Sequence, residues 1–493
     1  EILFKKEVVW AEVKEELRDA LNDFIEQVNG DKDSYMAEES KKGIYLIDAL
    51  INKHDVVVTN PPFSGKQNWC STLSNVLKTL YPNSCGDLYT CFIDRCRNLT
   101  KEEGYTGLIN IHSFMFTSSY EKIRKTILEN NIIETLVHLG PTFMELSNPY
   151  AQQCVMYVLK NKLPIKSKGV YFRVVNFINE EKRLAFKETL DKYLKGDKSD
   201  KVYVLEQDKL KTIPGWPFIY WISNTIRDLF LLDKSFNDVA KMCQGMTTTD
   251  TFRFLRFCWE VGITDIKFNC KDRNESKKCC LKWYPYMKGG TYNKWHGNQN
   301  YIVNYRNDGQ ELVDLVRKKY PRISDPEFVI KNRNCYFRKG ITYSALTTNK
   351  LSVRYMPEGF IFDVSGSAIF PFYEKSIFLM MAILNSHLGN YLAKILCPTV
   401  NYTIGDIARL PYPKIDKNKK IEEKIRDKVK YCIDLKKEMA KNDELSWKFT
   451  NPSSWHNKQI NSFEHKKQLA IFESEISEAV YKLYDIAQED IDQ

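Results

Sequence analysis

One short stretch constrains the fold of this chain more than any other. The β-branched run Val56–Thr59 is typical of a buried strand, and it ends abruptly at Asn60-Pro61-Pro62-Phe63. Because proline lacks a backbone N–H and fixes φ, a central strand has to end there in a stiff turn. In an open α/β sheet, ligands bind at the carboxyl ends of the strands. The stretch therefore predicts an α/β fold with a polar binding turn at a strand end.

The residues after this turn alternate between helical and strand signals, as βαβ units do. Helices are expected over residues 87–98 and 119–129, and strands over residues 105–111, 132–139 and 153–159. The apolar runs of these strands are continuous rather than alternating, which is typical of a sheet covered on both faces. This part of the chain predicts part of a doubly wound, Rossmann-like α/β sheet.

Changes in the character of the sequence predict four parts. Residues 1–165 carry the α/β pattern, and residues 166–235 are richer in charge and form a linker or extension. Residues 236–413 contain short strand-like pieces rich in aromatic residues and glycine, which predicts an α+β domain. Residues 414–493 combine Lys and Glu with apolar residues at helical spacing, which predicts a helical C-terminal region.

Composition excludes several classes of protein. Hydrophobic residues make up 43% of the 493 residues, so disorder is not expected, and no apolar run approaches the ~20 residues that cross a bilayer. The 13 cysteines are scattered, with neither a signal-peptide pattern nor two C-x-x-C pairs. Reduced thiols in the cytoplasm are therefore expected, and a metal site is not. The net charge of +10 permits a polyanionic partner without requiring one.

Motifs of other chemistries are missing from the sequence. There is no H-E-x-x-H pair, no G-x-S-x-G elbow and no Walker loop. Asp325, Glu327 and Lys331 have poor spacing for a nuclease cluster. His112 and His138 fall at predicted strand ends, where a packing role is favoured over a place in a binding cleft.

The turn itself carries groups suited to hold a primary amine. Asn60 offers a side-chain carbonyl, and the rigid rings of Pro61 and Pro62 hold backbone carbonyls in fixed positions. The amino group of a nucleobase is a poor nucleophile, and hydrogen bonds accepted from its N–H groups would orient it toward an electrophilic methyl group. Phe63 would stack on the base. The alternative is a turn without a ligand, since Asn-Pro is a common turn initiator.

The turn and the stretches that follow it resemble the N6-adenine DNA methyltransferases, whose motif reads Asn/Asp/Ser-Pro-Pro-Tyr/Phe. The resemblance implies a site-specific enzyme that transfers a methyl group from S-adenosyl-L-methionine to N6 of a flipped adenine. It implies catalytic roles for Asn60, Pro61, Pro62 and Phe63, and contact of Asn60 with the cofactor. The stretches that follow in the order of the family are GDLYTCFIDRC (86–96), GLINIHSFMF (107–116), IIETLVHLG (132–140) and AQQCVMYVLKN (151–161).

Later stretches are more distinctive, and they resemble the PglX family of bacteriophage-exclusion (BREX) defence systems, with type IIG restriction-modification enzymes as near relatives. This resemblance implies a role in phage defence, double-stranded DNA as partner, and other defence subunits as possible further partners. The stretches are QGMTTTDTFRFLRFCWEV (244–261), KWYPYMKGGTYNKWHGN (282–298), RKGITYSAL (338–346), GFIFDVSGSAIFP (359–371), PTVNYTIGDIARLPYP (398–413) and LSWKFTNP (445–452).

Residues 236–413 are implied by the same resemblance to be a target-recognition domain. Lys and Arg grip phosphate, while polar and aromatic side chains read or stack on bases. For any single residue a place in the core or on a solvated face is the commoner outcome, so the prediction is made for the region. The side chains favoured for DNA contact are Arg253, Arg256, Lys282, Trp283, Tyr286, Lys288, Arg338, Lys339, Tyr343 and Ser344.

One part of the family pattern is missing before the turn. The family binds S-adenosylmethionine with a glycine-rich loop, because glycine lets the backbone approach the cofactor closely. Before Asn60 the sequence offers only Gly30 and Gly43, and a helical pattern over residues 9–28 follows closely on the first residue, Glu1. We therefore expect a segment of a longer polypeptide, inactive by itself, with the rest of the cofactor site upstream of Glu1.

Two other functions stay open at this point. A non-catalytic DNA-binding or specificity subunit of a defence system would use residues 236–413 without methyl transfer. A methyltransferase acting on RNA or protein would share the turn at Asn60–Phe63 but prefer those substrates.

Overall fold

The structure is a computed structural model, and it describes residues 19, 20, 23, 31–142, 153–348, 350–397, 401–415, 419–450, 452, 456–487 and 490. Glu1 lies outside these residues, and so does almost all of the helix expected over residues 9–28. The chain divides into two compact units, which are described separately below. Unit 1 comprises residues 1–211 and 215–221, and unit 2 comprises residues 212–214 and 222–493.

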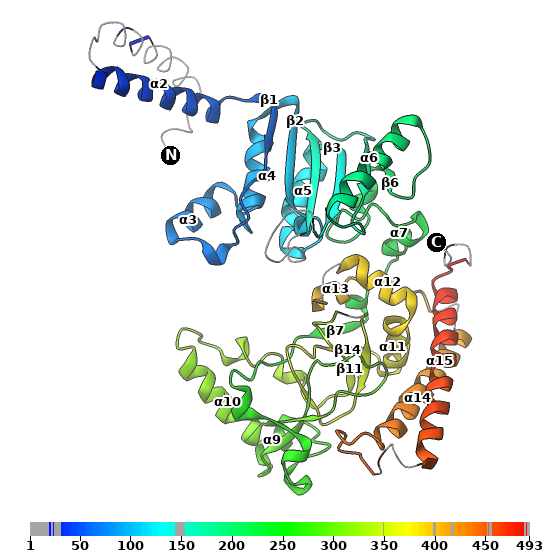
Figure 1. The fold of residues 1–493 in the computed structure, drawn as a ribbon. Coiled ribbons are helices and arrows are strands. Elements are labelled where there is room, and N and C mark those ends of the chain that lie inside the picture. The colour runs from blue at the N-terminus through cyan, green and yellow to red at the C-terminus, as the bar shows by residue number, and fades with distance from the viewer. Residues whose placement is uncertain are drawn as a thin grey trace. The chain divides into compact units, whose positions relative to one another are not determined.

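Unit 1 is built on one six-stranded sheet with the strand order β1-β2-β4-β3-β5-β6 (Figure 1). Strands β1 and β2 are parallel, as are β3 and β5, whereas β4 pairs antiparallel with both of its neighbours and β6 antiparallel with β5. The strands are β1 (His54–Thr59), β2 (Thr100–Ile111), β3 (Ile132–Gly140), β4 (Cys154–Lys160), β5 (Lys168–Arg173) and β6 (Val202–Glu206).

Helices pack on this sheet through apolar faces. Val137, Phe172 and Ala185 belong to one buried cluster that joins the sheet to helix α6. The helices of unit 1 are α2 (Asp31–Ile51), α3 (Ser71–Leu80), α4 (Leu88–Leu99), α5 (Glu121–Asn130) and α6 (Asn179–Lys195). All the helices and strands predicted between residues 56 and 159 are present. Residues 168–206, predicted as linker or extension, add the strands β5 and β6 to the sheet and the helix α6 beside it.

The expected coverage of both faces holds at the middle of the sheet but not at its edge. The residues from Leu136 to Gly140 in β3 are all buried. In β1, Val56 is 59% exposed and Val58 is 73% exposed. The reason is position: among the described residues, β1 pairs only with β2, so it is an edge strand.

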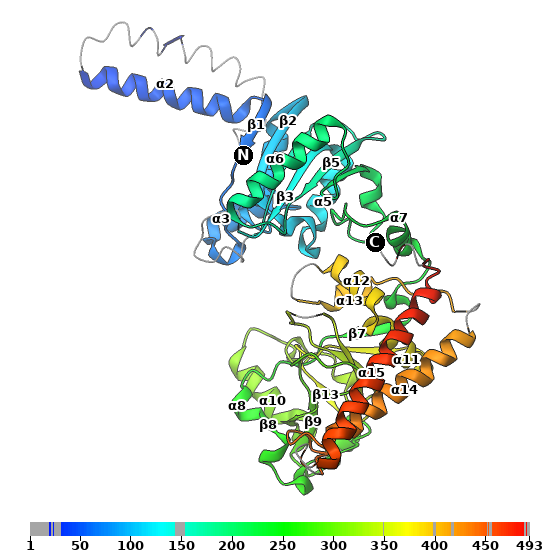
Figure 2. The same cartoon turned by 45° about the vertical axis from the view of Figure 1, so that its right-hand side comes forward.

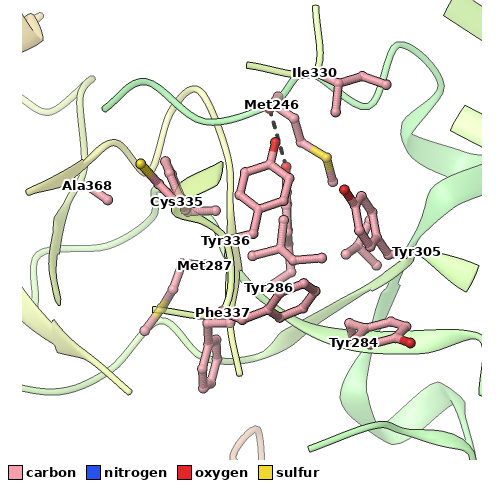
Figure 3. Packing of buried hydrophobic residues seen from close by; sticks show 14 of the residues in the cluster. Met246, Tyr284, Tyr286, Met287, Tyr305, Ile330, Cys335, Tyr336, Phe337 and Ala368 are labelled. Carbon is pink, nitrogen blue, oxygen red and sulfur yellow. Dashed lines mark hydrogen bonds between the residues drawn. The ribbon is translucent and has the colours of Figure 1, made fainter. Parts of the chain in front are cut away.

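Unit 2 contains two four-stranded sheets, with the orders β13-β9-β10-β8 and β12-β11-β14-β7. The first comprises β8 (Leu255–Phe257), β9 (Trp283–Met287), β10 (Tyr301–Asn304) and β13 (Ile361–Phe362). The second comprises β7 (Ala240–Cys243), β11 (Gly340–Tyr343), β12 (Val353–Met356) and β14 (Ala368–Pro371). One buried cluster, rich in aromatic residues, contains side chains from both sheets. Figure 3 shows Tyr284, Tyr286, Tyr305, Tyr336 and Phe337 in this cluster.

The helices of unit 2 frame these sheets. Helices α14 and α15 lie side by side in both views (Figures 1 and 2), and α11 packs against both. The two long C-terminal helices confirm the helical pattern predicted after residue 413. The helices are α7 (Asn224–Asp228), α8 (Thr251–Phe254), α9 (Arg273–Lys278), α10 (Arg306–Lys319), α11 (Ile377–Asn385), α12 (His387–Leu396), α13 (Ile404–Ala408), α14 (Lys419–Ala440) and α15 (His456–Leu483). None of the described helices is long and apolar enough to cross a membrane.

Candidate functional site

The turn Asn60–Phe63 lies at the carboxyl end of β1. Because β1 and β2 run parallel, with Thr59 opposite Leu108, the turn stands at the edge of the sheet where α/β proteins bind their ligands. Asn60 and Pro62 are exposed, Pro61 is buried, and Phe63 is half-buried. The turn thus exposes the Asn60 amide and the Pro62 ring to solvent, while the Pro61 ring is buried against the protein.

A single carboxylate ties the turn to the next helix. Asp87 accepts a hydrogen bond from the Ser64 N–H at 2.9 Å, and it also caps α4 in a capping box with Thr90. The Ser64 carbonyl in turn accepts hydrogen bonds from the Leu88 N–H at 3.1 Å and the Trp69 indole N–H at 2.9 Å. The backbone just after Phe63 is therefore held against the first turn of α4.

The Phe63 ring is supported from one side by aromatic neighbours. It meets the buried Tyr89 ring edge-on at 6.0 Å between centroids, and Tyr89 shares a 2.9 Å hydrogen bond with the Ser113 hydroxyl. Burial raises the pKa of Tyr89 well above its ordinary value, so its hydroxyl stays neutral. This contact chain connects the turn at the end of β1 to residues that follow β2.

His112, next to Ser113, pairs with the second predicted histidine. His112 Nδ1 and His138 Nε2 lie 2.8 Å apart, and His138 Nδ1 lies 3.2 Å from the Tyr220 hydroxyl. Burial, with a smaller contribution from the cation of Arg173, lowers the pKa of His112 to about 4, and burial lowers the pKa of His138 well below its ordinary value. Both imidazoles are neutral at pH 7, and they satisfy each other as a packed, hydrogen-bonded pair.

The structure places four of the predicted DNA-contact side chains inside unit 2. Tyr286 is fully buried and donates a hydrogen bond to the Asp363 carboxylate at 2.7 Å. Tyr343, Trp283 and Ser344 are also buried. Any influence of these four side chains on DNA would pass through the neighbours that they hold in place.

The six basic side chains of the same prediction lie nearer the surface, and most have partners. Arg253 pairs with Glu311 at 2.6 Å, and Lys339 pairs with Glu374. Arg256 donates to backbone carbonyls within its own segment. The remaining three each lie 5.2 Å from the centre of an aromatic ring: Lys282, Lys288 and Arg338. Whether they touch DNA stays a prediction.

A loop within the distinctive stretch 282–298 is held firmly in the structure, by residues that the sequence did not link to it. The segment Lys288–Asn298 lies between β9 and β10, and Gly290 exchanges two hydrogen bonds of 3.1 Å with the Ser344 hydroxyl. Arg354 and Glu473 hold the same loop from below, although neither was singled out. Residues 282–298 were among the distinctive stretches, but no pattern links them to positions 354 and 473.

The described residues do not by themselves fit S-adenosylmethionine. Such a site needs backbone that approaches the cofactor closely, and glycine is what permits this. Gly43, within α2, cradles nothing, since a Cβ added to it would meet no atom within 4 Å. Gly30 and Glu1 lie outside the described residues, so the expected cofactor segment upstream of Glu1 stays a prediction. Among the residues described, no group of three His, Cys, Asp or Glu side chains could hold a metal ion.

Comparisons with known proteins find similarity to adenine-specific and restriction-modification methyltransferases. Residues 3–143 match the Eco57I restriction-modification methylase family. The chain is 33% identical over 446 residues to the adenine-specific methyltransferase BrxX of Escherichia coli O9:H4 (strain HS), covering 88% of this chain and 33% of the relative. It is 31% identical over 407 residues to the adenine-specific methyltransferase PglX of Lacticaseibacillus casei (strain Zhang), covering 82% of this chain and 32% of the relative.

The chain therefore spans about a third of the length of the curated relatives that it matches. The fold is similar to that of the type IIL restriction-modification enzyme MmeI, solved in complex with DNA, with a TM-score of 0.56 and 12% identity. That likeness covers 89% of this chain and 55% of the MmeI chain. The predicted resemblance to adenine-specific methyltransferases of the PglX type and the predicted fold class are both confirmed.

Proposed function

We propose that this chain carries the base-accepting and DNA-recognising parts of a site-specific adenine-N6 DNA methyltransferase that acts in phage defence or restriction-modification. The observation that carries the proposal is the turn Asn60–Phe63 at the carboxyl end of β1, in a homologue of adenine-specific methyltransferases. Double-stranded DNA is the proposed partner, as DNA is of MmeI in the solved complex. We place the protein in the cytoplasm, where DNA and reduced thiols are found.

The proposed work of the turn is to hold the amino group of a flipped adenine. The Asn60 side-chain carbonyl and the Pro61 backbone carbonyl accept the two N–H hydrogens, and Phe63 stacks on the base. Stacking on an aromatic ring is worth ~1–3 kcal/mol per base, which offsets part of the few kcal/mol needed to unstack it. S-adenosylmethionine is the methyl donor that the relatives imply, and we derive no step through it from the described residues.

The test of this function is the substitution Asn60→Ala in the encoded protein. Losing one transition-state hydrogen-bond acceptor should lower the rate of adenine methylation by about 100-fold or more. Duplex affinity should stay within about twofold, because the phosphate contacts that dominate it lie elsewhere. Asn68→Ala is the matched control, since Asn68 is an exposed asparagine of the same segment. Methylation at the wild-type rate by Asn60→Ala would exclude the assignment.

The same assay separates the two alternative functions. A non-catalytic specificity subunit would bind duplex DNA and leave every adenine unmethylated, with wild type and Asn60→Ala alike. A methyltransferase for RNA or protein would transfer its methyl group to those substrates in preference to DNA. Base-by-base mapping of methylated phage and plasmid DNA distinguishes all three outcomes.

A further inference from the structure

Unit 2 buries an arginine that has no carboxylate partner among the described residues. Arg354 in β12 is completely buried. Its guanidinium lies 3.3 Å from the Ser344 hydroxyl and 3.5 Å from the Asn293 carbonyl, and its Nε has no hydrogen-bond partner. Burial alone lowers the pKa of Arg354 to about 10, so the side chain still carries its positive charge at neutral pH.

Other arginines of unit 2 are compensated differently. Arg273 and Arg333 share the buried Asp308 carboxylate at 2.7 and 2.9 Å, and Arg409 pairs with Asp406 at 2.7 Å. A buried charge with no opposite charge beside it is costly in free energy. The charge of Arg354 therefore costs more free energy than the charges of these paired arginines.

The Arg354 guanidinium lies against the loop Lys288–Asn298. Asn293, whose carbonyl faces the guanidinium, belongs to this loop, and Ser344 joins Arg354 to Gly290. The two backbone hydrogen bonds of Trp295, to Val353 and from Tyr355, flank Arg354 on its strand at 2.9 Å each. The loop is thus fixed directly above the buried cation.

Helix α15 and the loop's own side chains hold it further. Glu473 accepts hydrogen bonds from Lys294 at 3.0 Å and from the Trp295 indole at 2.6 Å. Asn298 donates to the Thr291 carbonyl at 3.0 Å. What the loop leaves in solvent is its tip, Gly290-Thr291-Tyr292, with the Tyr292 ring 40% exposed.

The tip carries a hydroxyl with its proton free to donate. The Thr291 Oγ1 accepts a hydrogen bond from the Asn293 amide at 3.2 Å, so its own hydrogen is available to an acceptor. An exposed donor on rigid backbone above a buried positive charge suits an anionic acceptor such as a phosphate oxygen. An adjacent exposed tyrosine adds a ring that packs on sugar or base.

We propose that the tip Gly290–Tyr292 contacts a backbone phosphate of double-stranded DNA, with Arg354 as a positioning residue that fixes the tip and supplies positive charge beneath it. The inference rests on the proposed function, since it names DNA as the partner. It goes beyond that function by assigning phosphate binding to three residues of the stretch 282–298 that are not among the side chains favoured for DNA contact from the sequence.

The test measures the affinity of the encoded protein for duplex DNA across a series of salt concentrations. Arg354→Met replaces the cation with an apolar side chain of similar length. Affinity at low salt should fall by about tenfold, and the slope of log affinity against log salt should become shallower by about 1. The thermal midpoint should stay level or rise, an outcome that a purely structural role of Arg354 would not give.

Two further variants make the result decisive. Thr291→Val keeps the shape of the tip and should lower duplex affinity several-fold without changing the salt slope. Arg322→Met removes the same charge from an exposed position and should change little. Wild-type affinity and slope in both Arg354→Met and Thr291→Val would overturn the inference, as would equal losses from Arg322→Met and Arg354→Met.

The outcomes also separate this inference from the proposed function. If wild-type protein binds duplex DNA and the variants bind equally well, only the role of the tip is excluded. If wild-type protein fails to bind duplex DNA at all, the proposed function falls and the tip's role falls with it. Should Arg354→Met lose its folded circular dichroism signal, the Thr291→Val result alone decides for or against the tip.

Discussion

The turn Asn60–Phe63 and the loop Lys288–Asn298 are held in place by different means. The turn owes its shape mainly to the covalent structure of two consecutive prolines. It is also held by the Asp87 carboxylate, which accepts a hydrogen bond from the Ser64 N–H directly after the turn. The loop has no proline and is held by tertiary contacts with Ser344, which follows β11, and with β12 and α15.

The two regions therefore differ in whether local or distant residues fix their geometry. A turn made rigid by its own sequence keeps its geometry even at a sheet edge with exposed neighbours. A loop made rigid by distant residues keeps its geometry only while unit 2 stays folded around it. Substitutions should therefore affect the stability of the loop more than that of the turn, and three predictions examine this contrast from the largest expected effect to the smallest.

The largest effect is expected from Trp295→Ala at the base of the loop. Trp295 is 1% exposed and donates to Glu473, so truncation leaves a cavity and removes one of the two hydrogen bonds to that carboxylate, the other coming from Lys294. The free energy of unfolding should fall by about 3–5 kcal/mol, as for buried Trp truncations in general. Chemical denaturation measures it. Trp259→Ala is the control, since Trp259 is 48% exposed, and a loss from Trp295→Ala as small as the control's would break the comparison.

An intermediate effect is expected from acid, which acts on both regions. His112, near the turn, and His296, in the loop, have pKa values lowered to about 4 and about 3, mainly by burial. A histidine with a depressed folded pKa contributes stability above its unfolded pKa of ~6.5 and loses it as pH falls toward the folded value. Between pH 7 and pH 5 each should cost about 2 kcal/mol.

Thermal midpoints recorded across that pH range test the expectation. The double variant His112→Gln/His138→Gln should flatten the part of the profile that belongs to unit 1, while His296→Gln should flatten the part that belongs to the loop. A profile unchanged by both variants would show that these histidines do not titrate on unfolding.

The smallest effect on stability is expected from Asp87→Ala beside the turn. Loss of the α4 cap should cost about 1 kcal/mol. Methylation should nevertheless fall far more than duplex affinity, because Ser64 loses the bond that fixes the backbone after Phe63. Asp272 caps α9 in the same way, since its carboxylate accepts a hydrogen bond from the Glu275 N–H at 2.8 Å. Asp272→Ala should leave methylation unchanged. Equal methylation by the two variants would argue that the prolines alone hold the turn.

The sequence predicted the turn and the extent of its strand well because both depend on local physics, whereas the predicted burial of that strand was wrong. A run of β-branched residues followed by two prolines leaves few structures open, and the position at a carboxyl end follows from the βαβ pattern. The burial of Tyr286 and Tyr343 was not predictable in the same way. Aromatic residues interleaved with lysine and arginine look alike whether they face a core or a ligand, and only the packing of two sheets decides.

Arg354 and Asp87 illustrate the two kinds of residue that pattern reading misses. Asp87 lies in the stretch 86–96, which resembles the methyltransferase family, and a carboxylate directly before a helix is a recognisable cap signal. Arg354 has no such local signal. Its significance comes from what is missing around it among the described residues, a compensating charge, and that is a property of the folded neighbourhood alone.

The exposed edge of the sheet has a consequence for strand pairing. In the part of the chain that the structure describes, β1 leaves backbone N–H and C=O groups along one side and two solvent-facing valines, a template on which other chains add strands. Within the strand, the negative charge of Asp55 opposes such strand addition, and the ion pair with Lys101 partly neutralises that charge. Within the described residues, this edge of the sheet is therefore a side of unit 1 that offers a strand for pairing.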